Sequence, residues 1–267
     1  MAGATEANDT GLVGAHIRGF AQLSRADVPF AGGKGANLGE LTAAGLPVPA
    51  GFVVGAPAYA AFCAETGVRE RLAALLDELD VEDTAKLQAA AEATRALFDN
   101  TPMPDALAAE IRSSYEQLVG AEREAPVAVR SSATAEDTEA ASFAGMNETF
   151  LNMRGADAVI DAVRRCWRSL FGARTIYYRR VNGFSQADMD IAVVVQLQVA
   201  STRAGVMFTV NPATGERDEL VIEGSFGLVP LCYIICRISI CMGEFTTSEQ
   251  IAIHNIQCVH RIINSGS

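Results

Sequence analysis

PVAVRSSATAEDTEAASFAGMNETF, residues 126–150, is the stretch from which the fold and chemistry of this chain are interpreted. A β-rich run, Val127 to Val129, is expected to deliver Arg130 at the end of a strand, and a loop of small and acidic residues, Ser131 to Gly145, follows it. A guanidinium group is permanently charged and suits bidentate contact with phosphate. The stretch therefore predicts an anion site. The alternative is a structural salt bridge from Arg130 to Glu136 or Asp137.

A second element of this kind lies upstream, in GGKGANLGEL at 32–41. Glycines allow close backbone approach, and the N–H groups at a helix start favour anions. The glycine cluster Gly32 to Gly35 is expected to open a helix that continues from Asn37 to Gly45. Lys34 supplies a mobile charge, and the chain has only one other lysine, Lys86. The Walker A spacing is absent, and a flexible turn with a solvated lysine is the alternative. Together the two elements indicate nucleotide chemistry.

Composition limits the classes of protein that fit. The chain has 267 residues, 49% of them hydrophobic, and a net charge of −11. That charge argues against a nucleic-acid binder. No signal peptide and no run of about 18 apolar residues are present, so a cytoplasmic protein without a membrane span is expected. Cys63 and Cys166 are interpreted as buried thiols.

The sequence changes character after Leu228. Nine isoleucines and four cysteines follow in 39 residues, against six isoleucines before the break. One interpretation is a buried strand pair. A second is a metal site, although the C-x3-C-x4-C spacing matches no common zinc pattern. The favoured interpretation is a frameshift, altered splice or mis-joined reading frame over 229–267. The cysteines and histidines concerned are Cys232, Cys236, Cys241, Cys258, His254 and His260.

Hydrophobic periodicity and turn residues predict a mixed α/β fold of the α+β class, because helices precede a strand-rich half. Trp167 is expected in the core. Gln196 and Gln198 alternate with apolar residues on a predicted buried strand, where either adenine or another backbone group would satisfy them. The predicted helices are 56–67, 68–79, 83–98, 104–119 and 156–171, and the predicted strands are 16–23, 48–54, 149–151, 191–199, 205–210 and 219–223.

From about His16 to Leu228 the chain resembles the N-terminal nucleotide-binding domain of the phosphoenolpyruvate synthase and pyruvate phosphate dikinase family, which rifampicin phosphotransferase shares. The motifs are GGKGANLGELTAAGLPVPAGFVV, VAVRSSATAEDTEAASFAGMNETFLN, SLFGARTIYYRRVNGF, VVVQLQV, AGVMFTVNPATG and EGSFGL. The resemblance implies an ATP-grasp fold with ATP held between two lobes. It also implies that a histidine of a separate domain takes the phosphoryl group and passes it to pyruvate or, in the antibiotic-inactivating branch, to rifampicin.

The resemblance assigns site residues by motif. Lys34 and Arg130 would contact the phosphates, with Arg130 as the catalytic contact, and Gly145 and Thr149 would lie on the loop that covers them. Gln196 and the backbone of Leu197 and Gln198 would meet adenine at the hinge.

The departures from the family pattern limit the prediction. The glutamate and the Q-[AS]-R-P segment that supply magnesium ligands in the family are absent from this sequence, so no metal ligand is assigned. We expect a disordered N-terminus at 1–15, a first lobe at 16–195 with a helical insert at about 56–120, the start of a second lobe at 196–228, and the atypical tail at 229–267. The chain is expected to be inactive alone. The alternatives are a rifampicin phosphotransferase domain and a non-catalytic nucleotide-binding or partner protein.

Overall fold

The computed structural model describes residues 15–134, 148–184, 190–211, 214–217, 219–226 and 236–241. The chain forms two compact units, Met1–Gln198 and Val199–Ser267, which are considered separately. The predicted disorder of the N-terminus concerns residues that, apart from Ala15, lie outside the described ranges. Most of the 229–267 tail, including His254 and His260, also lies outside them.

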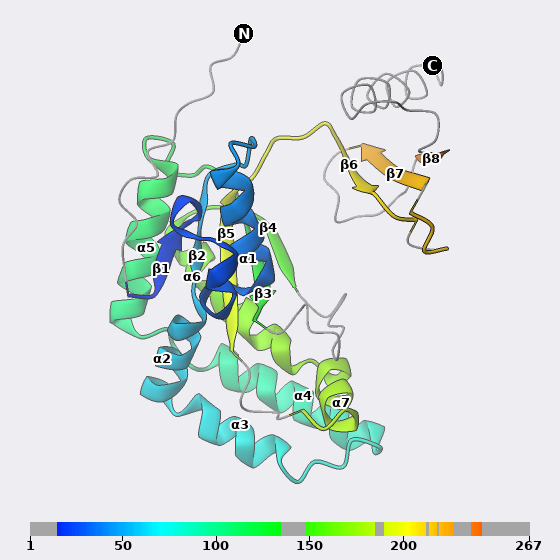
Figure 1. Ribbon diagram of the computed structural model, residues 1–267. Coiled ribbons are helices and arrows are strands. Elements are labelled where there is room, and N and C mark those ends of the chain that lie inside the picture. Colours follow the sequence, from blue (N-terminus) through cyan, green and yellow to red (C-terminus); the bar gives the residue numbers. More distant parts are fainter. Residues whose placement is uncertain are drawn as a thin grey trace. The chain divides into compact units, whose positions relative to one another are not determined.

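The first unit is built on a five-stranded sheet with the strand order β1-β2-β5-β3-β4 (Figure 1). Every neighbouring pair is antiparallel. Of these five strands, β5 comes last along the chain, and it lies between β2 and β3 in the sheet. The strands are β1 Ile17–Gly19, β2 Gly51–Val54, β3 Val127–Ala133, β4 Thr149–Met153 and β5 Ile191–Leu197.

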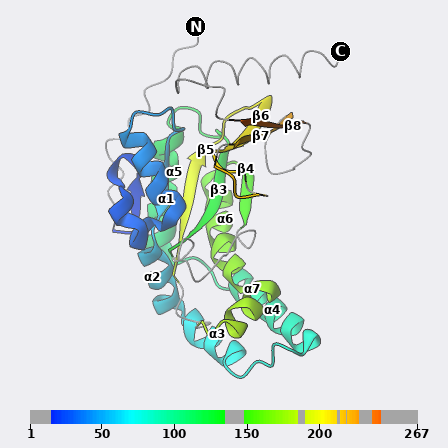
Figure 2. The same cartoon turned by 45° about the vertical axis from the view of Figure 1, so that its right-hand side comes forward.

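Helices cover both faces of this sheet (Figures 1 and 2). Local signals fix several ends: the Asp83 carboxylate accepts hydrogen bonds from the first-turn amides of α4, and Gly67, at φ 65°, ends α2. The helices are α1 Val28–Ala43, α2 Ala56–Thr66, α3 Val68–Leu76, α4 Thr84–Asp99, α5 Asp105–Val119, α6 Ala156–Arg168 and α7 Ala173–Val181, with short 3-10 helices η1 Phe20–Gln22, η2 Arg25–Asp27 and η3 Ser169–Phe171.

Two sequence-based expectations near the N-terminus are wrong. The strand predicted at 16–23 ends at Gly19, and η1 begins at Phe20. The N–H of Gly19 donates to the Gln22 side-chain oxygen, and the N–H of Leu23 donates to the carbonyl of Phe20. The helix that the glycine segment is expected to open, and that is expected to continue to Gly45, begins earlier, at Val28, so the glycines lie inside it. The other predicted helices are present with ends shifted by a few residues.

The main core lies between the sheet and helices α2 to α6. Trp167, predicted to be a core residue, is fully buried, and its ring lies 5.7 Å from Tyr59 and 5.1 Å from Phe62, centre to centre. Cys63 and Cys166 are buried as predicted. A smaller cluster lies on the opposite face of the sheet, where Ala31 of α1 packs with Val53 and Val194. The α1 face and the α5–α6 face are therefore distinct.

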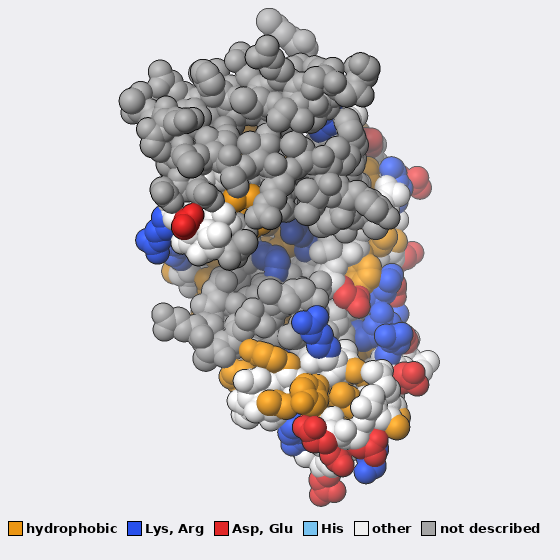
Figure 3. All heavy atoms as spheres, turned by 90° about the vertical axis from the view of Figure 1, so that its right-hand side faces the viewer, with side chains coloured by type: hydrophobic (Ala, Val, Ile, Leu, Met, Phe, Trp, Pro, Cys, Tyr) orange, Lys and Arg blue, Asp and Glu red, His pale blue; other side chains and the backbone are white. Residues whose placement is uncertain are grey.

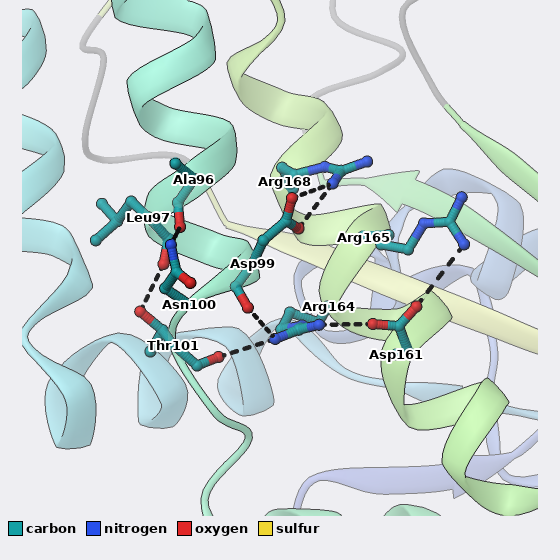
Figure 4. Close-up of polar contacts among 9 residues, drawn as sticks. All are labelled: Ala96, Leu97, Asp99, Asn100, Thr101, Asp161, Arg164, Arg165 and Arg168. Carbon is teal, nitrogen blue, oxygen red and sulfur yellow. Dashed lines mark hydrogen bonds and ion pairs between the residues drawn. The ribbon is translucent and has the colours of Figure 1, made fainter.

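Arginines of α6 tie that helix to the end of α4 (Figure 4). The Arg164 guanidinium donates to the carbonyls of Asp99, at 3.0 Å, and Thr101, at 3.3 Å, and Arg168 contacts both carboxylate oxygens of Asp99, at 2.7 and 3.0 Å. Cations at a helix C-terminus satisfy unpaired carbonyls and oppose the helix dipole. These arginines have structural partners and are not free to bind a ligand.

The second unit contains a three-stranded antiparallel sheet in the order β6-β7-β8. Its strands are β6 Arg203–Phe208, β7 Glu219–Phe226 and β8 Cys236–Cys241. Leu220 and Val221 are buried, whereas Val206 and Met207 on β6 are exposed. The described part of the tail thus contributes one strand, which pairs with β7.

The described helices include none that is long and apolar enough to cross a membrane. Exposed hydrophobic side chains do occur. On the face in Figure 3 they lie among acidic and basic side chains over the lower, helical end of the molecule. The exposed large hydrophobic residues of the helical elements include Leu75 on α3 and Tyr177 and Val181 on α7.

Candidate functional site

The glycine segment lies inside α1 and breaks it. Gly32 has φ 65° and ψ 173°, so the helical conformation stops at this residue and starts again after it. Gly33, Lys34 and Gly35 therefore form the first turn of a new helical segment, as expected for a segment that opens a helix. The first N–H groups of such a turn attract anions. Lys34, half-buried in this turn, carries the positive charge.

The glycines serve packing within the protein. A Cβ atom at Gly32 would lie 2.3 Å from the backbone oxygen and from Oγ of Ser132 on β3. A Cβ atom at Gly35 would lie 3.0 Å from a Val53 methyl group on β2. The sequence alone assigned these glycines to approach of a ligand, but at least these two are required for close approach of α1 to the sheet.

Ser132 joins the two sequence elements. Its hydroxyl donates to the carbonyl oxygen of Ala31 at 2.9 Å and accepts from the N–H of Gly35 at 3.3 Å. These bonds bridge the break at Gly32 from a strand about one hundred residues away in sequence. The sequence analysis gave Ser132 no role. No signal in the sequence pointed to it, because Ser132 fell in the predicted loop; in the structure β3 continues to Ala133, and Ser132 lies on the same side of that strand as Arg130.

Arg130 lies in the middle of β3 and not at its end, because β3 continues to Ala133. The predicted loop beginning at Ser131 is thus strand for its first three residues. Arg130 is exposed, and within the described part of the chain it makes no ion pair or side-chain hydrogen bond. The alternative of a salt bridge to Glu136 or Asp137 concerns residues outside the described ranges.

Thr149 is the cross-strand partner of Arg130 on β4. Directly opposed residues of an antiparallel pair share a face. Ser132 and Arg130 are two residues apart on β3, and Gln196 on β5 is paired with Ala128, two residues from Arg130 on the other side. Arg130, Thr149, Ser132 and Gln196 therefore belong to the face of the sheet on which α1 packs.

The three residues predicted to meet adenine have partners inside the protein. The Gln196 side-chain amide donates to the carbonyl of Pro49 at 3.0 Å, and the Gln198 side-chain oxygen accepts from the N–H of Asn152 at 2.7 Å. The N–H of Leu197 donates to the carbonyl of Ala50. Backbone groups therefore satisfy the hydrogen-bonding atoms of these residues. Their contact with adenine stays a prediction. Gly145 lies outside the described residues.

Burial strongly shifts the pKa values of three groups of the first unit, Tyr59, Cys166 and Arg179, and it raises the pKa of Tyr59. Burial raises the pKa of the Cys166 thiol far above its ordinary value. Burial also lowers the pKa of Arg179 on α7 to about 10, and among the described residues none of its three guanidinium nitrogens has a hydrogen-bond partner. Arg179 is fully buried, with its guanidinium carbon 5.3 Å from the centre of the Phe171 ring. It belongs to the packed core and not to the face around Arg130.

Magnesium does not fit the described residues. Within the ranges that the structure covers, no group of three or more His, Cys, Asp or Glu side chains is placed to hold a metal ion. The donor set at the candidate site consists of cations, hydroxyls and amide N–H groups, which suit an anion. No step is therefore assigned to a metal.

The arrangement defines the class of protein: an α+β domain with a glycine-rich helical turn and an arginine on one face of an antiparallel sheet. Residues 28–230 match the model of the pyruvate phosphate dikinase AMP/ATP-binding domain. The chain belongs to this family of AMP/ATP-binding domains.

Similar proteins are phosphoenolpyruvate synthases of archaea. A probable phosphoenolpyruvate synthase of Methanothermobacter thermautotrophicus is 50% identical over 216 residues, covering 80% of this chain and 31% of the relative. One of Archaeoglobus fulgidus is 51% identical, covering 78% of this chain and 28% of the relative. The phosphoenolpyruvate synthase of Pyrococcus furiosus is 44% identical, covering 79% and 30%. The chain thus spans about a third of the length of these relatives.

Proposed function

We propose that this chain carries the ATP-binding part of a phosphoenolpyruvate synthase-like dikinase, in an ATP-grasp-like domain with a truncated second lobe. The parent enzyme would phosphorylate pyruvate at the expense of ATP, through a phosphohistidine on another domain. The family match and the relatives named phosphoenolpyruvate synthase support this proposal. The observation that carries it is the pairing of Arg130 with Thr149 on the sheet face that holds the Lys34 turn.

Lys34 and Arg130 would neutralise phosphate oxygens, and Thr149 would offer a hydroxyl beside Arg130. Gly145 would belong to the segment that covers the phosphates. Gln196, Leu197 and Gln198, at the end of β5, would border adenine. Such a site works by positioning and by stabilising charge. Magnesium, which the family implies, would need ligands that the described residues do not supply.

The chain alone would therefore bind ATP at most weakly and would not turn it over. The proposal also includes a first lobe at 16–195 with a helical insert at about 56–120, a second lobe beginning at 196–228, an atypical tail at 229–267 and a cytoplasmic location. The family match ends at residue 230, two residues after the compositional break, which supports a foreign tail. Sequencing the genomic DNA around codon 228 tests it: a restored frame encoding the missing glutamate and Q-x-R-P supports a frameshift, and an unchanged frame refutes it.

Calorimetric titration with ATP tests the site. Arg130→Ala should weaken ATP binding by at least about 1.5 kcal/mol, because a charge-assisted hydrogen bond is lost. Arg95→Ala is the matched control, since Arg95 is exposed on α4, which packs on α3, α6 and α7. Equal ATP affinity of the two variants would refute the assignment of Arg130.

The identity of the molecule that receives the phosphoryl group is tested with the full-length gene product. Consumption of ATP that depends on pyruvate supports the synthase branch, and consumption that depends on rifampicin supports the alternative. The names of the relatives favour pyruvate.

A further inference from the structure

We propose that Ser132 is a positioning residue that fixes the Lys34 turn relative to Arg130. This inference rests on the proposed function, because Lys34 and Arg130 are the two groups that would contact the phosphates. Ser132 itself would not touch the nucleotide. Its hydroxyl is fully engaged, and its side chain is completely buried.

The geometry makes Ser132 the link between the two cationic segments. Its Oγ bonds on both sides of the break at Gly32, to Ala31 O and to Gly35 N. Lys34 lies between those two attachment points in sequence, and Arg130 lies two residues along β3. A single hydroxyl therefore sets where the Lys34 turn begins relative to the strand that carries Arg130.

Gly32 makes this link close and specific. The residue has φ 65°, a region that other residues rarely adopt. The space where its Cβ would stand is taken by Ser132, at 2.3 Å from Oγ and from the carbonyl oxygen. The α1 backbone thus rests directly on the Ser132 backbone and hydroxyl. Without the hydroxyl, the N–H of Gly35 and the carbonyl of Ala31 lose their buried partner, which favours a shifted turn.

Ser131 provides a natural control. It is the same residue type in the same strand, and it is equally buried. Its hydroxyl donates to the carbonyl of Glu148 at 3.3 Å, on the β4 side, and among the described residues it makes no hydrogen bond to α1. Alternation along the strand places Ser131 and Ser132 on opposite faces. Loss of either hydroxyl therefore removes a buried hydrogen bond, but only Ser132 supports the Lys34 turn.

The first measurement needs no nucleotide. Hydrogen exchange of the Gly35 amide is compared in the unsubstituted chain, Ser132→Ala and Ser131→Ala. Exchange at Gly35 should accelerate about tenfold or more in Ser132→Ala and stay within about twofold in Ser131→Ala, because one buried hydrogen bond is lost at Gly35 only in the former. Equal protection of Gly35 in all three proteins overturns the inference. Ser132→Cys, of similar volume and weaker hydrogen bonding, replaces Ser132→Ala if that variant does not fold.

The second measurement separates positioning from general stability. ATP affinity is measured by calorimetry for Ser132→Ala in the unsubstituted and Arg130→Ala backgrounds. The serine substitution should weaken binding about tenfold in the first and at most about twofold in the second, because only one cation is left to be positioned. The same fold loss in both backgrounds indicates a general structural role and overturns the inference. Unweakened binding in Ser132→Ala overturns it while the proposed function stands, whereas no ATP binding by the unsubstituted chain overturns both.

Discussion

Replacing Arg179 by methionine should stabilise the first unit. The Arg179 guanidinium is fully buried, and within the part of the chain that the structure describes none of its nitrogens has a hydrogen-bond partner. Burial lowers its pKa to about 10, which corresponds to a penalty of about 3 kcal/mol for the charged form. The contact with the Phe171 ring at 5.3 Å offsets roughly 0.5–2 kcal/mol of that penalty. Arg179→Met should therefore raise the free energy of unfolding by about 1–3 kcal/mol.

The effect should follow pH in a defined direction. Because the pKa of Arg179 is lower in the folded state, the unfolded state binds more protons at pH values between about 10 and the ordinary pKa of arginine. The penalty is therefore fully present at neutral pH and is relieved only as pH rises through that window. The difference between Arg179→Met and the unsubstituted protein should be constant from about pH 6 to pH 8.

Urea unfolding followed by tryptophan fluorescence is the assay, because Trp167 is the only tryptophan and lies in the first unit's core. Arg164→Met is the matched control: the same substitution removes bonds to the carbonyls of Asp99 and Thr101 and should destabilise by about 1–3 kcal/mol. Destabilisation by Arg179→Met of more than about 1 kcal/mol would refute the reasoning, since it would mean that the guanidinium has a partner in solution.

Three further outcomes are expected. Gly32→Ala should destabilise the unit by about 1–3 kcal/mol more than Gly45→Ala in urea unfolding, because both glycines have positive φ but only Gly32 has atoms in the space of a Cβ; equal costs would contradict the observed close approach. The Cys166 thiol should resist alkylation at pH 8 in the native state and react after unfolding, because burial raises its pKa; rapid native labelling would argue against that burial. Hydrogen bonds from Ser24, followed by Arg18, lower the pKa of Asp27, so its stabilisation is present above the ordinary Asp pKa and lost as pH falls through the lowered value; acid unfolding at higher pH in Ser24→Ala checks this, and an unchanged midpoint would oppose it.

Much of the helical part of the fold was predictable because its signals are local. Apolar periodicity marked α3 to α6, and Pro104 preceded α5, where it forms the N-cap. The early start of α1 was not predictable in this way. Glycines disfavour helices, yet Gly35 and Gly39 let α1 approach Val53 and Leu23 so closely that side chains there would clash. Tertiary packing therefore overrides local propensity in this segment.

The strand order was harder to predict from the sequence. The chain reaches β5 last and inserts it between β2 and β3, which the sequence does not encode in any one segment. This insertion brings Gln196 opposite Ala128 and next to Gly51. The partner of the Gln196 side chain, Pro49, is almost 150 residues away in sequence. The sequence indicated that a partner must exist, but not whether it would be a ligand or the backbone.

The contrast between Arg130 and Arg179 shows what sequence motifs leave open. Both arginines belong to motifs shared with the same family, and both carry the same charge. Arg130 is exposed on a strand, beside a threonine and close in sequence to the serine that holds the Lys34 turn. Arg179 is fully buried, with its guanidinium over the Phe171 ring. The fold gives Arg130 access to solvent and nearby hydrogen-bond donors, so it is suited to bind an anion. It buries the charge of Arg179, which lowers the stability of the protein.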